Sequence, residues 1–253
     1  MTAKADAGAP CRFLDFDSRL FQRRIATMTA RTIDRPGLER ALAWCAERRI
    51  DCLYFLAAGD DAATLRLARD RGFEFVDVRM TLERSLSGAQ AEAAGANRLR
   101  LAREADVPAL REIAAASHVQ SRFWVDERFD RRACAELYAT WIERSCQGYA
   151  DAVWVAQDER GVAGYLTCHR REGGAGEIGL VGVAGRAQGR GLGRALLARG
   201  IEWFRGAGCE RARVVTQGAN VPAQRLYQAA GFQTASVEIW HHLWRTADEG
   251  ARA

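Results

Sequence analysis

Residues 183–194, which read VAGRAQGRGLGR, decide the fold. A short apolar run ends at Val183, glycines alternate at positions 189, 191 and 193, and a segment with helical periodicity follows. Glycine lets the backbone approach a ligand and adopt a positive φ, and the start of a helix offers unpaired N–H groups at the positive end of its dipole. The pattern therefore predicts a strand, a pyrophosphate-binding loop and a helix, in that order.

Two common phosphate-binding motifs do not fit this loop. A P-loop would end in Gly-Lys-Ser or Gly-Lys-Thr, and a dinucleotide fingerprint would place its third glycine at position 194, where this chain has Arg194. Arg186, Arg190 and Arg194 add positive charge, which favours a ligand with several phosphates. A flexible turn without a ligand is the alternative, but it gives no reason for alternating glycines beside arginines.

The segments around the loop alternate between strand and helix patterns. We expect strands at 98–102, 153–156, 162–168, 177–183, 213–216 and 234–244, and helices that begin after Asp106 and cover 131–146, 190–206 and 221–230. Asp106 is expected to cap the first of these helices, and Gly231 to end the last one. The alternation predicts an α/β (α+β) fold around a mixed central sheet.

A small-residue segment suggests two domains. Residues 85–97, SLSGAQAEAAGAN, lack hydrophobic periodicity, which is typical of a linker. We therefore expect a first domain over 1–88, a linker over 89–97 and a second domain over 98–253.

An internal repeat relates the two predicted domains. A shift of 159 positions aligns residues 44–73 with residues 203–232 without a gap, and it matches Trp44 with Trp203 and Gly72 with Gly231. The first domain is thus predicted to be a smaller, partial copy of the second, with a structural role because no glycine-rich loop precedes the repeat. A chance match of a common helix–Gly–Phe–strand pattern is the alternative.

Composition narrows the class of protein. The chain has 253 residues and 48% hydrophobic composition, which suit a globular protein, and its formal charge of +5 suits an anionic small molecule such as a nucleotide diphosphate as well as it suits nucleic acid. The seven scattered cysteines contain no C-x-x-C pair, which argues against a disulfide framework and a zinc site. The start has no apolar signal segment, and no run approaches the about 18 apolar residues of a membrane span. We expect a cytoplasmic protein without metal, membrane or nucleic-acid partners.

Two motifs carry a resemblance to a known family. Val183 followed by Gln188-x-x-Gly191-x-Gly193, and residues 220–232, NVPAQRLYQAAGF, resemble two neighbouring motifs of the GNAT N-acetyltransferases. Together they are more specific than either alone, and Gly185, where many members have proline, is a small departure. The resemblance implies acetyl-CoA as cosubstrate and a GNAT fold, preceded here by a partial GNAT-like domain.

The resemblance also implies roles for individual residues. Tyr227 matches the family's general acid, and backbone N–H groups at Val181 or Val183 would polarise the thioester oxygen. The predicted contacts to acetyl-CoA are Val181, Val183, Gln188, Gly189, Arg190, Gly191, Leu192, Gly193, Arg194, Asn220 and Ala223.

Some of these residues have plainer explanations. Tyr227 could pack on the sheet as an ordinary helix tyrosine, and Asn220 could act as a helix N-cap. The candidate bases for deprotonating the amine are His118, His169, His241 and His242, and no spacing selects one of them.

A closer resemblance concerns the acceptor. The segments 106–113, 120–123, 138–143 and 240–245 look like the dTDP-fucosamine acetyltransferase type within the family. That resemblance implies an amine on a dTDP-4-amino-4,6-dideoxyhexose, with substrate contacts from Ser121, Arg122 and Phe123. Arg122 would pair with a diphosphate and Phe123 would stack on a base or sugar, while a packed aromatic turn is the alternative.

Two other functions stay open from the sequence. One is acetylation of a protein N-terminus, a lysine or a polyamine, which would call for an acidic groove, whereas residues 117–132 contain more arginines than carboxylates. The other is a non-catalytic acyl-CoA-binding regulator. The partial first domain is also compatible with a homodimer interface.

Overall fold

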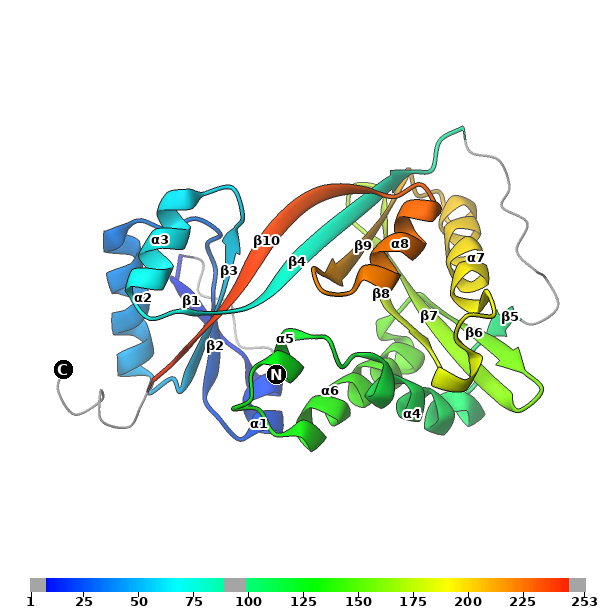
Figure 1. Ribbon diagram of the computed structural model, residues 1–253, viewed down its shortest axis with the longest axis horizontal. Helices are drawn as coiled ribbons and strands as arrows, with labels where there is room; N and C mark the ends of the chain where they lie inside the picture. Colours follow the sequence, from blue (N-terminus) through cyan, green and yellow to red (C-terminus); the bar gives the residue numbers. More distant parts are fainter. Residues whose placement is uncertain (1–7, 89–98, 246–253) are drawn as a thin grey trace. The chain divides into compact units, whose positions relative to one another are not determined.

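The computed structural model describes residues 8–88 and 99–245 (Figure 1). Contacts divide these residues into two compact units: unit 1 contains 8–79, 125–130 and 237–245, and unit 2 contains 80–88, 99–124 and 131–236. The predicted linker at 89–97 lies outside the described residues. Each unit is built from several separate segments of the chain, whereas the predicted domains 1–88 and 98–253 are continuous. The assignment of those two domains stays a prediction.

Unit 2 contains most of the predicted α/β pattern. Its order is β5 (Leu99–Leu101), α4 (Val107–Ser117), α5 (Arg122–Val125), α6 (Arg131–Arg144), β6 (Ala152–Asp158), β7 (Gly161–Arg171), β8 (Ala175–Val183), α7 (Leu192–Gly206), β9 (Arg211–Gln217) and α8 (Val221–Ala229). With β4 (Glu74–Ser85), the strands lie in the order β4-β9-β8-β7-β6-β5. β8 and β9 are parallel, whereas β5, β6, β7 and β8 pair antiparallel. The mixed α/β sheet predicted from the sequence is confirmed.

Burial explains why α7 lies on this sheet. The helix is amphipathic, and it buries Leu196, Leu197, Ile201 and Phe204 in a core that also contains Trp154 and Tyr227. Each buried large apolar side chain contributes roughly 1.5–3 kcal/mol relative to exposure. This packing holds the first turn of α7 beside the ends of the central strands.

Unit 1 is a smaller α/β assembly. It contains β1 (Cys11–Phe13), α1 (Asp15–Phe21), β2 (Ile25–Met28), α2 (Arg35–Glu47), β3 (Cys52–Ala58) and α3 (Ala62–Asp70), while β4 (Glu74–Ser85) and β10 (Gln233–Trp244) have residues in both units. The strands lie in the order β1-β2-β3-β10. Its core is built from residues of β2, β3 and α2 that include Leu38, Leu53 and Phe55.

The predicted repeat is present in the backbone. Residues 52–58 of β3, 62–70 of α3 and 74–85 of β4 correspond, with the same shift of 159 positions, to β9, α8 and β10. Asp61 and Asn220 cap the equivalent helices α3 and α8, and Gly72 and Gly231 follow them with φ of 77° and 79°. Shared caps and shared left-handed glycines over three consecutive elements favour a true repeat over a chance match.

The last strands of the two repeats are exchanged. β10 pairs antiparallel with β3, residues 238–244 against residues 52–58, and β4 lies beside β9. The strand beside β3 therefore comes from the second repeat, and the strand beside β9 comes from the first.

Asp106 acts differently from the sequence prediction. It is the N-cap residue of α4, but its side chain makes no capping hydrogen bond to that helix. Its carboxylate instead accepts hydrogen bonds from Arg100 Nη1 and Nη2 at 2.6 and 2.8 Å and from the Arg103 N–H at 2.8 Å. The interaction with Arg100 joins β5 to the start of α4 and lowers the pKa of Asp106.

We expect Asp106→Ala to lower the free energy of unfolding by about 2 kcal/mol, because it leaves charge-assisted hydrogen bonds of Arg100 unmade. The folded pKa of Asp106 is depressed, so its contribution is complete above the unfolded pKa of about 3.9 and is lost as the pH falls through the folded value. Urea unfolding of both proteins at pH 7 and at pH 3 measures this. Equal stability of the two proteins at pH 7 would exclude a stabilising role.

None of the helices in the described part of the chain is long and apolar enough to cross a membrane.

Candidate active site

The site begins where two parallel strands separate. β8 and β9 are in register from Ala175–Ile178 against Arg211–Val214, whereas the next residues of β8, to Val183, and of β9, to Gln217, have no pairing with one another among the described residues. An opening between parallel strands leaves backbone groups free to bind an extended ligand as an added strand would.

The direction of the backbone N–H groups in β8 follows from their partners. The Ala184 N–H donates to the Ala163 carbonyl at 2.8 Å, and the Leu180 N–H donates to Thr167 Oγ1 at 2.8 Å, both toward β7. Since N–H directions alternate along a strand, those of Val181 and Val183 point away from β7, to the side of the opening. These are the two groups that the sequence predicted as donors to a thioester oxygen.

The glycine loop leads into α7 with its helix N-terminus uncapped. Gly189 and Gly191 have φ of 74° and 80°, and Gly191 is the N-cap residue without a side-chain cap. A Cβ at either glycine would meet nothing within 4 Å, so the reason for glycine is the left-handed backbone. Gln188 Nε2 donates to the Val183 carbonyl at 3.3 Å and links the loop to the strand.

The corresponding helix in unit 1 is different. α2 has Asp34 as its N-cap, and the carboxylate accepts the Gly37 N–H at 2.8 Å. A carboxylate at this position neutralises the helix terminus and repels an anion. The first turn of α7 is therefore open to a phosphate, whereas the first turn of α2 is not.

A cavity of about 700 Å³ follows the opening in unit 2. It is lined by residues 116–120, 178–183, 187–189, 191–193, 214–217 and 220, by Tyr138, Trp141, Pro222, Ala223, Leu226 and Tyr227. No Asp, Glu, Lys or Arg side chain is among these described lining residues. An uncharged wall favours an acceptor group that enters without a net charge.

Most of the predicted cofactor contacts line this cavity. They are Val181, Val183, Gln188, Gly189, Gly191, Leu192, Gly193, Asn220 and Ala223. Arg190 and Arg194 do not line it and are exposed next to the loop. Arg186 is directed elsewhere, since its Nη2 donates to Asp158 at 3.2 Å and to the Val162 carbonyl at 2.9 Å.

Asn220 combines two of its predicted features. Its side chain accepts the Ala223 N–H at 3.2 Å as the N-cap of α8, and the residue also lines the cavity. The N-cap role predicted for Asn220 is confirmed, and its contact with the cofactor stays a prediction.

Tyr227 lies on α8 and reaches the same cavity. The residue is 5% exposed, and its ring packs against Phe232 with centroids 6.0 Å apart. Burial raises the pKa of the hydroxyl above its ordinary value, so Tyr227 stays protonated at neutral pH. A protonated hydroxyl on the cavity wall has the chemistry of a proton donor.

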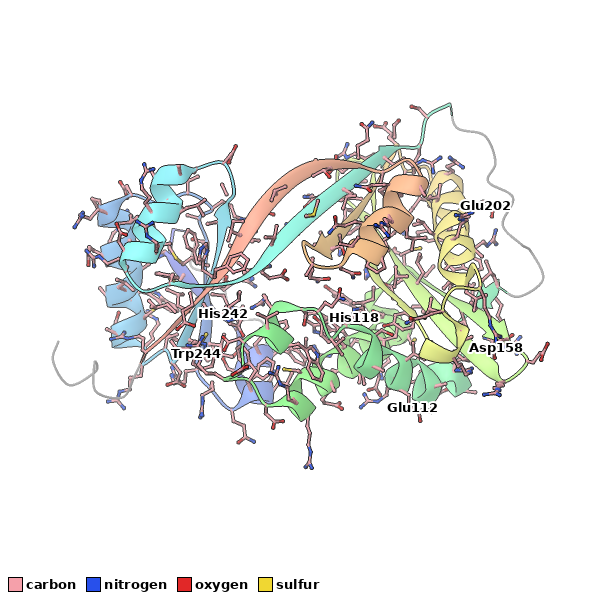
Figure 2. All side chains as sticks on the ribbon, viewed as in Figure 1. Glu112, His118, Asp158, Glu202, His242 and Trp244 are labelled. Atoms are coloured by element: carbon pink, nitrogen blue, oxygen red, sulfur yellow. The ribbon has the colours of Figure 1, made fainter. Side chains whose placement is uncertain are left out.

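His118 is the one of the four histidines that lines the cavity. It ends α4 (Figure 2), stacks on Tyr138 with centroids 4.4 Å apart, and its Nε2 lies 3.0 Å from the Tyr165 hydroxyl. Burial lowers the pKa of His118 to about 4, so the ring is neutral at pH 7. No sequence spacing distinguished His118, because the strand that carries Tyr165 is 47 residues away.

The predicted acceptor contacts lie outside the cavity lining. Phe123 is buried, its ring meets Trp141 edge-on with centroids 6.4 Å apart, and its carbonyl accepts from Cys134 Sγ. The Arg122 guanidinium lies 4.0 Å from the centre of the Phe123 ring, and Ser121 is buried beside them. Ser121 precedes α5, Arg122 and Phe123 begin it, and the role of these three residues toward an acceptor stays a prediction.

The sequence prediction did not include Tyr138 and Trp141 as site residues, although both line the cavity. They are three positions apart on α6, so they share one face of the helix. The spacing of these two aromatic residues was the feature of the sequence that could have indicated a shared position at the site.

In the described ranges 8–88 and 99–245, no group of three or more His, Cys, Asp or Glu side chains could hold a metal ion.

Comparison with known proteins finds acetyltransferases that are named for different acceptors. The model of the acetyltransferase (GNAT) family matches residues 107–232. The dTDP-fucosamine acetyltransferase of Escherichia coli O6:H1 is 30% identical over 145 residues, which are 55% of this chain and 60% of that protein. A mycothiol acetyltransferase of Saccharomonospora viridis is 31% identical over 245 residues, 89% of this chain and 76% of that protein.

A solved structure agrees with the fold. The GCN5-related N-acetyltransferase from Sphaerobacter thermophilus has a TM-score of 0.63 over 92% of this chain and 76% of that chain, at 18% identity. The chain spans 60% of the Escherichia coli relative, while its match to the Saccharomonospora protein extends through both units. This chain therefore belongs to the GNAT family of acetyltransferases.

Proposed function

We propose that this chain transfers the acetyl group of acetyl-CoA to the amine of a nucleotide-linked amino sugar. The observation that carries the proposal is the opening between β8 and β9, which adjoins the uncapped start of α7 and shares one cavity with Tyr227. The N-terminal N–H groups of α7 would bind the pyrophosphate, with Arg190 and Arg194 available for further phosphate charge. The pantetheine arm would lie along β8.

The chemistry is a direct transfer. The amine nitrogen attacks the thioester carbon, the N–C bond forms, and the C–S bond breaks. The N–H of Val181 or Val183 stabilises the charge on the thioester oxygen, and Tyr227 gives its proton to the departing thiolate. The nitrogen loses its proton to water after the N–C bond has formed, when it is far more acidic, so a neutral amine requires no strong base. Tyr227 regains a proton from solvent before the next turnover.

The wall of the cavity supports a sugar as acceptor. Its lining includes two aromatic residues, Tyr138 and Trp141, and residues with neutral polar side chains, Ser117, His118 and Gln120. A lysine or polyamine cation would lose hydration here without gaining a carboxylate partner. The similarity to a protein named for dTDP-fucosamine supports an amino sugar of that class, with Arg122 as the proposed partner of its diphosphate.

A second candidate acceptor is the unacetylated amine precursor of mycothiol. The similarity to a mycothiol acetyltransferase that covers 89% of this chain favours it. A homodimer and a cytoplasmic location stay predictions from the sequence.

Release of free CoA thiol from acetyl-CoA by the purified protein tests the proposal. The acceptors compared are dTDP-4-amino-4,6-dideoxyhexoses, the mycothiol precursor amine, spermidine and a lysine peptide. We expect turnover with the sugar nucleotides and none with spermidine or the peptide. Turnover with the mycothiol precursor alone would support acetyl transfer but would show that the acceptor is not a sugar nucleotide. Binding of acetyl-CoA without turnover of any amine would favour a regulator.

A further inference from the structure

Thr167 is a buried polar residue at the centre of unit 2. It lies on β7 with 0% exposure and does not line the cavity. Its Oγ1 accepts the Leu180 N–H at 2.8 Å and lies 3.3 Å from His169 Nε2. Since the hydroxyl accepts from Leu180, its own proton is free to donate to His169.

The Leu180 N–H belongs to a β-bulge. Leu166 pairs with Val181 and Cys168 pairs with Ile178, so the two residues Gly179 and Leu180 stand opposite the single residue Thr167. An extra residue in one strand loses its regular backbone partner. The side chain of Thr167 supplies the partner, which is why a hydroxyl is buried in the middle of a strand.

The bulge decides which N–H groups reach the opening. Because Leu180 donates toward β7, the next N–H, that of Val181, points to the opposite side. A regular strand without the extra residue would reverse this alternation on one side of the bulge. The hydrogen bond from the Leu180 N–H to Thr167 therefore fixes the side of β8 to which the N–H groups of Val181 and Val183 point.

Side chains of β7 also support the bulge from one face. Thr167 and His169 are two positions apart and share that face of β7. A Cβ at Gly179 would lie 2.6 Å from His169 Nε2 and 2.8 Å from Thr167 Oγ1, so the backbone of the bulge packs directly on both side chains. These side chains therefore limit displacement of the bulge toward that face of the sheet.

We propose that Thr167 is a positioning residue for acetyl transfer, which aims the Val181 N–H at the thioester oxygen by holding the Leu180 N–H. This inference rests on the proposed function, since it deepens the role of the same site. Thr167 acts through Leu180 and touches neither the cavity nor the reacting atoms. Its effect therefore belongs to kcat and not to the binding of acetyl-CoA.

The test compares Thr167→Val, which removes the hydroxyl at nearly constant shape, with Thr167→Ser, which keeps it. We expect Thr167→Val to lower kcat by about 10- to 100-fold, less than the loss of a complete oxyanion donor, with the KM for acetyl-CoA unchanged within about 2-fold. Thr167→Ser should retain most of the wild-type kcat. Thr167→Ala, which adds no apolar group in place of the hydroxyl, is the second measurement if valine is not tolerated, with the same loss expected.

A spectroscopic measurement separates positioning from stability. The carbonyl stretch of bound acetyl-CoA labelled with ¹³C at the thioester carbon reports polarisation of that oxygen. We expect its shift to lower frequency to diminish in Thr167→Val and to be retained in Thr167→Ser. If Thr167→Val has the kcat and the carbonyl stretch of the wild type, the positioning role of Thr167 is wrong and the proposed function stands. If the wild-type protein does not bind acetyl-CoA, both the positioning role and the proposed function are wrong.

Discussion

Replacing Tyr227 with phenylalanine is expected to lower kcat by about 10²-fold or more, with little change in the KM for acetyl-CoA. The ring remains packed against Phe232, and only the hydroxyl is lost. Without that hydroxyl the thiolate leaves without a proton donor, and the barrier to C–S cleavage rises. Steady-state release of CoA thiol at saturating acceptor measures the effect.

The matched control is Tyr149→Phe, because Tyr149 is 70% exposed and does not line the cavity. It should retain wild-type kcat. Burial raises the pKa of Tyr227, so the wild-type rate should not decline at the ordinary tyrosine pKa near 10. A kcat of Tyr227→Phe equal to that of the wild type would leave Tyr227 as a packing residue only.

Replacing Gly191 with aspartate is expected to raise the Kd of acetyl-CoA by about 10²-fold, roughly 2.7 kcal/mol. The substitution puts a carboxylate at the N-cap of α7, as Asp34 does at the N-cap of α2. The negative charge would lie within a few ångströms of the pyrophosphate and neutralise the helix terminus that attracts it. Calorimetric titration of acetyl-CoA gives the Kd.

The matched control for this charge effect is Gly191→Asn. Asparagine has the shape of aspartate and tolerates the left-handed backbone that Gly191 adopts at φ of 80°. We expect its Kd to lie close to that of the wild type, and the affinity difference between the two variants to shrink as salt is added. Equal affinities of the aspartate and asparagine variants at low salt would mean that the phosphates bind elsewhere.

Much of the fold was predictable because its signals are local. The strands and helices of unit 2 occur close to the predicted ranges, since apolar periodicity, a capping Asn220 and a left-handed Gly231 act within a few residues of one another. The repeat was predictable for the same reason, because both copies keep the same spacing of Trp, Gly and Phe.

The exchange of β4 and β10 was not predictable from that spacing. Each of these strands follows an equivalent helix at the same spacing, so the order of elements along the chain does not tell which neighbour each strand takes. The assignment of β10 to β3 and β4 to β9 depends on which side chains pack across the assembled sheets. These contacts join residues that are far apart in the sequence, so no periodic pattern in the sequence predicts them.

For the site, the sequence by itself determined the glycine loop, the helix that follows it and the position of Tyr227 on α8. Those features depend on φ preferences and short spacings, which are properties of neighbouring residues. Only the tertiary structure decided that His118 meets Tyr165, and that Thr167 holds the bulge beside Val181. The physical reason is that pairing between strands brings together groups that no local pattern relates, and a single extra residue in β8 redirects its N–H groups.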